Sequence, residues 1–167
     1  MTATGRPPGV VVRPARPEEA GTVAELFNGI NSIGRDAPPV TMTAEHVRRH
    51  LLGADPWAVL LVGELDEVVA GFVTASPTYD SERAAGCFII VDLYVAPAAR
   101  RHGLGRALMA GMAAEARRRG AGCLWWGVDD GDDEAFAFYR AIGAEAAEHF
   151  TGMILTDRAF TVLADAA

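Results

Sequence analysis

A short basic turn that contains two glycines offers the clearest chemistry in this sequence. Arg100, Gly103 and Gly105 stand at the fixed positions of an Arg-x-x-Gly-x-Gly motif, which follows an apolar run and Pro97. Glycines let main-chain N–H groups approach a ligand closely, and the N-terminus of a following helix adds roughly half a positive charge. Together these features are typical of a pyrophosphate-binding site. The sequence therefore predicts a phosphate-bearing cofactor at the end of a sheet.

Two other phosphate-binding turns fit this segment less well. A dinucleotide-binding turn requires Gly-x-Gly-x-x-Gly and an acidic residue about 20 positions later, and neither occurs here in the right register. A nucleoside-triphosphate loop requires Gly-Lys-Ser/Thr, and the chain contains no lysine. Coenzyme A is then the best-fitting ligand, with Arg100, Arg101 and Arg106 adding positive charge to the main-chain donors.

Tyr139 and Asp92 are two side chains that could move protons. Tyr139 falls on a predicted helix at 134–142, and its hydroxyl is a weak acid. Asp92 lies in a predicted strand, where a carboxylate can bind an alkyl ammonium (pKa about 10.4) and accept its proton. Each also has a structural explanation: Tyr139 as a core aromatic, Asp92 as a solvent-facing or arginine-paired residue.

An alternation of strands and helices is predicted to position these residues. Thr43 is the expected N-cap of one helix, and a short C-terminal helix is expected from about Asp157, after at least one further strand beyond Ala144. The pattern favours an α/β (α+β) fold in a single domain at 10–167, behind a flexible segment at 1–9. Strands are expected at 10–13, 57–62, 68–74, 87–95 and 123–128, and the main helices at 105–119 and 134–142.

Composition limits the partners of the chain. Its 167 residues, half of them hydrophobic, fit one domain with one core. A formal net charge of −7 argues against nucleic-acid binding, which requires phosphate-neutralising cations. No run approaches the roughly 20 apolar residues that span a membrane, and the N-terminus lacks the apolar core of a secretory signal. A cytoplasmic protein without membrane or nucleic-acid partners is expected.

The cysteines and histidines do not predict a metal site. Cys87 and Cys123 both lie in strand-like apolar runs, which favours buried free thiols over a disulfide. The four histidines lack ligand spacing with the two cysteines, so no metal is expected.

The segments discussed above resemble the GCN5-related N-acetyltransferase (GNAT) family. The turn, after a strand ending in Leu-Tyr-Val-x-Pro, resembles that family's acetyl-CoA signature. Residues 132–144 resemble its Asn-x-x-Ala-x-x-Phe-Tyr-x-x-x-Gly-Phe pattern, with Asp132 in place of the asparagine and Ala144 in place of the aromatic residue. The resemblance covers about residues 10–164. It implies an acyl-CoA N-acyltransferase fold: a mixed, mostly antiparallel sheet of six or seven strands flanked by helices, with strands 87–95 and 123–128 splayed to admit the cofactor.

The resemblance also implies roles for matching residues. The amides of residues 102–106 hold the pyrophosphate, the strand main chain pairs with the pantetheine arm, Tyr139 is the catalytic acid, and Asp92 binds and deprotonates the substrate ammonium. Tyr79 and Asp80, expected in a polar loop, match the diamine acetyltransferase branch and are implied to bind substrate. That branch has Glu-Asp where this chain has Val91-Asp92. The implied cofactor-binding set is Leu93, Tyr94, Val95, Arg100, Arg101, His102, Gly103, Leu104, Gly105, Arg106 and Asp132.

The implied activity is transfer of acetyl from acetyl-CoA to a primary amine of a small molecule by direct attack, in a homodimer. The alternatives are a non-catalytic acyl-CoA-binding module, acetylation of a protein or peptide amine, and a preference for longer acyl chains. The loops at 31–43 and 76–86 are expected to form the acceptor pocket.

Overall fold

A computed structural model describes residues 9–147 and 151–166, and the chain divides after Gly127 into two compact units. The predicted flexible segment 1–9 lies outside the described residues except for Gly9. Among the described residues, no helix has the length and apolar character that crossing a membrane requires. In the same part of the chain, His, Cys, Asp and Glu side chains do not gather in a group of three or more that could hold a metal ion.

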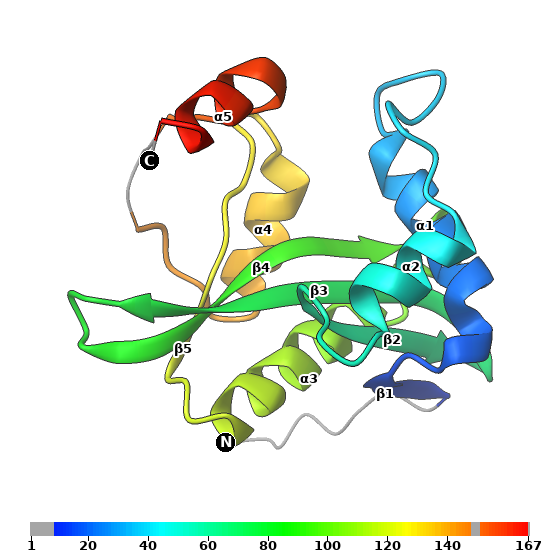
Figure 1. Cartoon of the computed structure of the whole chain (residues 1–167). Coiled ribbons are helices and arrows are strands. Elements are labelled where there is room, and N and C mark those ends of the chain that lie inside the picture. The colour runs from blue at the N-terminus through cyan, green and yellow to red at the C-terminus, as the bar shows by residue number, and fades with distance from the viewer. Residues whose placement is uncertain (1–8, 148–150, 167) are drawn as a thin grey trace. The chain divides into compact units, whose positions relative to one another are not determined.

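The first unit is built on one mixed sheet of five strands in sequential order (Figure 1). The first four strands are antiparallel neighbours, whereas the fifth pairs in parallel with the fourth because a helix crosses between them. The strands are β1 (Val10–Pro14), β2 (Val59–Leu65), β3 (Val68–Asp80), β4 (Ala85–Val95) and β5 (Cys123–Trp125).

Helices α1 (Ala20–Asn31) and α2 (Ala44–Leu51) cover one face of this sheet. Phe27 of α1 packs on Phe72 of β3, with ring centroids 4.2 Å apart, and Phe72 lies beside Tyr94 of β4. The predicted cap of α2 is confirmed, because the Thr43 side chain accepts the main-chain N–H of His46. This face holds a continuous apolar cluster.

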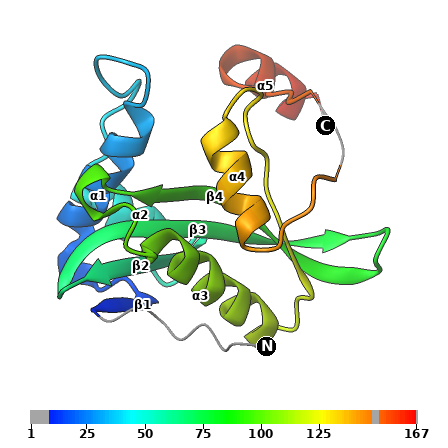
Figure 2. The ribbon, with the colours of Figure 1, turned by 180° about the vertical axis from the view of Figure 1, so that it is seen from behind.

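Helix α3 (Leu104–Arg118) covers the opposite face (Figure 2). Gly63 and Gly71 allow its close approach: a Cβ built on Gly63 would lie 2.7 Å from the Leu104 side chain, and one on Gly71 would lie 3.2 Å from Leu108. Helix α3 therefore begins at a fixed depth against the sheet.

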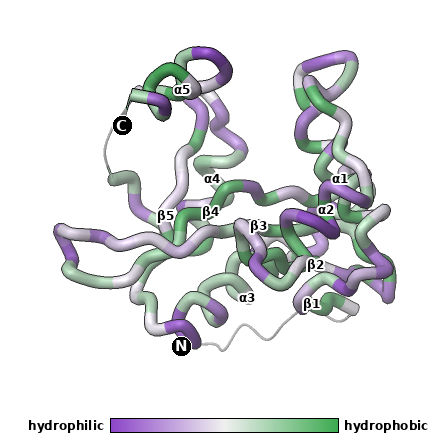
Figure 3. Tube along the Cα trace, viewed as in Figure 1, coloured by the Kyte–Doolittle hydropathy of each residue, from purple (hydrophilic) through white to green (hydrophobic). Residues whose placement is uncertain are grey.

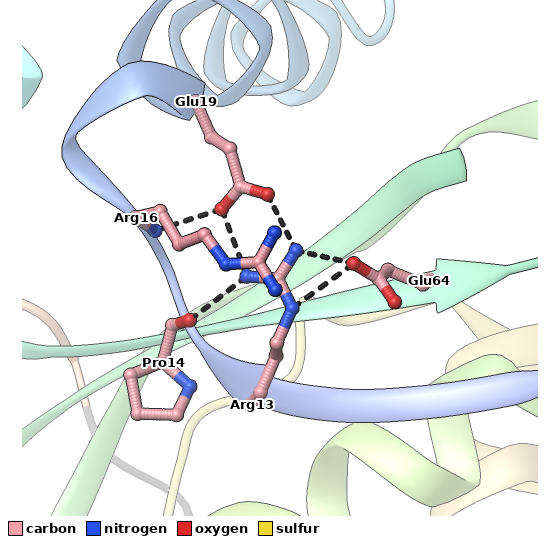
Figure 4. A network of polar contacts seen from close by, with 5 residues as sticks. All are labelled: Arg13, Pro14, Arg16, Glu19 and Glu64. Atoms are coloured by element: carbon pink, nitrogen blue, oxygen red, sulfur yellow. Dashed lines mark hydrogen bonds and ion pairs between the residues drawn. The ribbon is translucent and has the colours of Figure 1, made fainter. Parts of the chain in front are cut away.

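A polar network joins β1 and β2 to the 3-10 turn Pro17–Glu19 (Figure 4). The Arg13 guanidinium donates to the carboxylates of both Glu19 and Glu64, and the Arg16 main-chain N–H donates to Glu19 at 2.7 Å. The hydrogen bonds that Arg13 donates lower the pKa of Glu19 to about 2, and the two accepting carboxylates raise the pKa of Arg13.

The second unit contains α4 (Asp133–Ala141) and α5 (Asp157–Ala164), the latter beginning at the predicted residue. None of its described residues is buried, and its apolar side chains include Met153, which is 91% exposed. The further strand expected beyond Ala144 is not formed by the described residues 144–147 and 151–156.

Three predictions need correction. The described residues form five strands rather than six or seven. Strand β3 runs six residues beyond Thr74, so Tyr79 and Asp80 end a strand instead of lying in a loop; the hydrophilic tip that follows them is visible in Figure 3. Cys87 and Cys123 are not free thiols: they are register partners on β4 and β5 with Cα atoms 4.8 Å apart, joined by a disulfide. Sequence spacing alone does not give strand register, so it could not reveal this pairing.

Candidate active site

Strand β4 bulges just before Asp92. Thr74 pairs with Asp92 and the adjacent Ala75 pairs with Ile90, so Val91 is the extra residue on β4. Because side chains alternate along a strand, the bulge places Ile90 and Asp92 on opposite faces of the sheet. Asp92 shares its face with Tyr94, which belongs to the cluster under α1. The carboxylate therefore lies on the face that α1 and α2 cover.

A buried threonine holds Asp92 in place. Thr74 Oγ1 lies 3.0 Å from Asp92 Oδ2 and accepts the Asp92 main-chain N–H at 3.2 Å. Thr74 is 2% exposed and is the one buried polar residue in the described part of the chain. Burial raises the pKa of Asp92, and the Thr74 hydrogen bond opposes part of that rise. The result is an oriented carboxyl group with increased proton affinity.

The edge of β4 that faces away from β3 pairs with β5 over only part of its length, and this pairing stops before Asp92. The β4–β5 ladder has three residue pairs and ends at Ile89 and Trp125. Just after β4, the Ala96 main-chain N–H donates to the Ala70 carbonyl of β3 at 2.8 Å. The Val95 carbonyl, across the same planar trans peptide, therefore points to the opposite edge. This edge of β4 is where the pantetheine arm was expected to pair.

The turn after β4 presents main-chain donors at a helix N-terminus. It passes through a 3-10 turn at Pro97–Ala99, and Arg101 and Gly103 then adopt left-handed conformations with φ of 69° and 80°. Gly103 is the N-cap of α3 and has no capping side chain, and the first α-helical bond runs from Ala107 N–H to Gly103 C=O. The amides of the first turn point out of the helix end, as an anion site requires.

Two side chains brace the turn from within. Arg100 Nε donates to the Val95 carbonyl at 3.1 Å, and His102 Nδ1 donates to the Arg100 carbonyl at 2.7 Å. Residues 97–106 include no acidic side chain, and Arg100, Arg101 and Arg106 are all exposed. This donor set, with positive charge and no carboxylate, fits a pyrophosphate.

The remaining predicted site residues are distributed over the two units. Tyr139 lies on α4 of the second unit, half-buried, and burial and the nearby Asp132 carboxylate raise its pKa. Asp132 is the N-cap of α4, where its Oδ1 accepts the Ala135 N–H at 2.9 Å. The structure thus gives Asp132 a capping contact, whereas the resemblance implied a contact with the cofactor.

Tyr79 and Asp80 are not brought to Asp92. They stand five and six residues beyond Thr74 along β3, roughly 17 Å and more at the usual rise of an extended strand. The Asp80 carboxylate accepts the main-chain N–H groups of Glu82 and Arg83 and pairs with the Arg83 side chain, which lowers the pKa of Asp80. Asp80 therefore organises the tip of the β3–β4 hairpin, and the Tyr79 side chain beside it is exposed.

Thr74 is the site residue that sequence analysis missed. It appeared only as the end of an apolar strand, and its one distinguishing signal was a hydroxyl within the run 68–75. Its partnership with Asp92 depends on strand register, which the sequence does not state. Tyr94 also differs from expectation in one respect: its side chain is buried beneath α1, so only its main chain faces the edge of β4.

Comparison with known proteins identifies the same architecture. The model of the Acetyltransferase (GNAT) family matches residues 24–144. The chain is 28% identical over 134 residues to the uncharacterized N-acetyltransferase YhfO of Bacillus subtilis (strain 168), covering 80% of this chain and 89% of that protein. It is 39% identical over 80 residues to L-ornithine N5-acetyltransferase NATA1 of Arabidopsis thaliana, covering 48% of this chain and 35% of that protein.

A solved structure of similar fold is the aminoglycoside acetyltransferase meta-AAC0020, from an uncultured soil metagenomic sample, in complex with sisomicin. It superposes with a TM-score of 0.73 at 17% identity, over 90% of this chain and 97% of that chain. At this identity the likeness establishes the fold.

Proposed function

The chain belongs to the Acetyltransferase (GNAT) family, and we propose that it transfers an acetyl group from acetyl-CoA to a primary amine of a small molecule. One observation carries the proposal: β4 holds an oriented, half-buried carboxylate, Asp92, and the turn that follows the same strand presents a basic helix N-terminus that has no capping side chain. The carboxylate is suited to an ammonium, and the turn after the strand is suited to a pyrophosphate.

The turn is assigned to the cofactor. Main-chain N–H groups at His102 to Arg106 would hold the pyrophosphate, and the exposed arginines would add charge. The free edge of β4 would hold the pantetheine arm by main-chain hydrogen bonds. When bound, acetyl-CoA supplies the acetyl group as an activated thioester.

Asp92 is assigned to the acceptor amine. An alkyl ammonium, with a pKa of about 10.4, must lose a proton before its nitrogen can attack. Asp92 can bind the cation and then accept that proton, directly or through water, and its raised pKa makes it a stronger base than an ordinary aspartate. Thr74 fixes the direction in which its carboxylate points.

Tyr139 is assigned to the departing thiolate. Burial raises the pKa of its hydroxyl, so the side chain stays protonated at neutral pH and retains a proton to donate. Direct attack by the amine requires no covalent enzyme intermediate.

A terminal aminoalkyl group is the preferred acceptor class. The name of the plant relative gives L-ornithine N5 as its target, and the soil acetyltransferase was crystallised with sisomicin, an aminoglycoside ligand. Asp92 is a single half-buried carboxylate, which suits one ammonium group on a flexible alkyl or sugar carrier.

Thiol release from acetyl-CoA tests this function across ornithine, alkyl diamines, aminoglycosides, α-amino acids and a peptide N-terminus. We expect release with at least one small aminoalkyl acceptor. Tyr139→Phe should lower kcat about 10²- to 10⁴-fold with little change in cofactor affinity. If the protein binds acetyl-CoA and no amine raises release above background, it is a binding module. If the peptide is the preferred acceptor, the small-molecule assignment is wrong.

A further inference from the structure

The Cys87–Cys123 disulfide joins β4 to the short edge strand β5. It lies at the first of the three residue pairs that join β4 and β5. Strand β5 is an edge strand of three residues, and its ladder to β4 is correspondingly short. Non-covalent pairing of this length is weak, because isolated short pairings are only marginally stable. The disulfide is therefore the strongest restraint that holds β5 on the sheet.

The chain connectivity gives this restraint its importance. Strand β5 ends at Trp125, and the second unit, which carries Tyr139, begins at Val128. In chain order, the second unit therefore begins three residues after the end of β5. The pyrophosphate turn is joined differently, because Arg100 to Gly103 follow β4 directly within the first unit.

The two cysteines differ in exposure. Cys87 is 3% exposed, whereas Cys123 is half-buried. An attacking thiolate must reach a sulfur atom along the disulfide axis, so exchange would begin at Cys123. In reducing compartments, protein disulfides are usually transient and redox-sensing rather than permanent.

We propose that Cys87 and Cys123 form a thiol–disulfide exchange site that controls how firmly β5, and so the start of the second unit, is held to the sheet. In the forward step a low-molecular-weight disulfide, RSSR, reacts with the two cysteine thiols. One RS group bonds to Cys123 with release of RSH, and Cys87 then displaces the second RS group as RSH. Two thiols are oxidised, one disulfide is reduced to two thiols, and both protons leave with the products. A dithiol reverses the sequence.

Hydrogen exchange on the full-length protein tests the restraint without reference to catalysis. One sample is treated with oxidised glutathione and the other with dithiothreitol. Their redox state is verified by mass spectrometry, since reduction adds the mass of two hydrogen atoms, and by alkylation of free thiols. We expect the amides of Leu124 and Trp125 to exchange at least about tenfold faster after reduction. Val62 and Val73, in the centre of the sheet, serve as internal controls and should not change.

Two outcomes overturn the proposal. One is complete reduction with less than a twofold change in the β5 amides. The other is failure of oxidised glutathione to join the cysteines in the folded protein. Because neither readout uses turnover, they decide the proposal even if the protein proves to have no acetyltransferase activity.

A kinetic experiment rests on the proposed function. It distinguishes an effect on Tyr139, in the second unit, from an effect on coenzyme A binding at the turn in the first unit. Reduction should lower kcat several-fold, because Tyr139 depends on β5 for its attachment, while the dissociation constant of coenzyme A changes less than twofold. Cys123→Ser should match the reduced protein and show no response to dithiothreitol. An equal loss in Cys123→Ser with and without reductant supports the proposal, and a continued response to dithiothreitol in this variant contradicts it. Chemical reduction of the wild type carries the test if the variant does not fold.

Discussion

The Thr74 hydroxyl lies 3.0 Å from a carboxylate oxygen of Asp92 and also accepts the main-chain N–H of the same residue at 3.2 Å. One buried side chain thus fixes both the strand position and the carboxylate of the proposed base. The pair crosses from β3 to β4 at the bulge, where regular pairing alone would not fix the geometry.

Thr74→Val removes this hydrogen bond with little change in volume. Because the bond opposes the burial that raises the pKa of Asp92, its loss should raise that pKa further. We expect the acid limb of the kcat/KM profile to move to higher pH, so activity on that limb should fall relative to wild type. Thr74→Ser should restore the wild-type limb. A uniform loss at all pH values, with no shift of the limb, would show that Thr74 acts only on folding.

Asp92→Asn should lower the activity of the protein and raise the stability of its folded state at neutral pH. Its folded-state pKa lies above the ordinary value of 3.8, so ionisation of Asp92 destabilises the folded state as pH rises through that value. We expect the asparagine variant to lose about 10²-fold or more in kcat/KM and to be more stable than wild type in urea at pH 7. The stability difference should vanish below about pH 3.8.

Asp55→Asn is the matched control, since Asp55 is an exposed aspartate in the loop before β2. It should change neither activity nor the pH dependence of unfolding. If Asp92→Asn keeps full activity, another group accepts the proton.

Gly103→Ala tests the turn against a control on the same helix. Gly103 and Gly120 both have left-handed φ angles, 80° and 84°, and lie at the two ends of α3. An added Cβ in this conformation costs about 1 kcal/mol in either place. We expect both alanine variants to lose about this much unfolding free energy, but only Gly103→Ala to weaken coenzyme A binding, by at least about tenfold. Equal affinities by calorimetry would place the cofactor elsewhere.

Glu19→Gln tests the Arg13 network. Its folded pKa, about 2, lies below the ordinary value of 4.5, so Glu19 contributes stability above pH 4.5 that is lost as pH falls towards 2. The variant should be about 2 kcal/mol less stable than wild type at pH 7, and the two unfolding curves should converge by pH 2. Glu18→Gln, in the same 3-10 turn but exposed, should match wild type throughout. A constant difference across this pH range would exclude an electrostatic origin.

The sequence predicted those features whose causes are local. Helix α3 begins within one residue of its predicted start because the glycine turn and the apolar spacing both lie nearby in the chain. The Thr43 cap and the start of α5 are local in the same sense. The family also follows from contiguous motifs.

What the sequence did not predict depends on register. Thr74 meets Asp92, and Cys87 meets Cys123, only because particular strands pair in a particular alignment. Strand β3 continues to Asp80 because β4 pairs with it from Gly71 to Asp80, although the residues from Ser76 to Thr78 resemble a loop. Such partners lie 18 to 36 residues apart, beyond the reach of local propensity.

Because Val91 is the extra residue of the bulge, the strand should tolerate a different side chain at this position but not the loss of the residue. The Val91 side chain is 60% exposed, so many residues could replace it. Deleting it would restore strict alternation and turn either residues 85–90 or the strand from Asp92 onward to the wrong face. In a library built to alter acceptor preference, position 91 can accept wide substitution but not a gap.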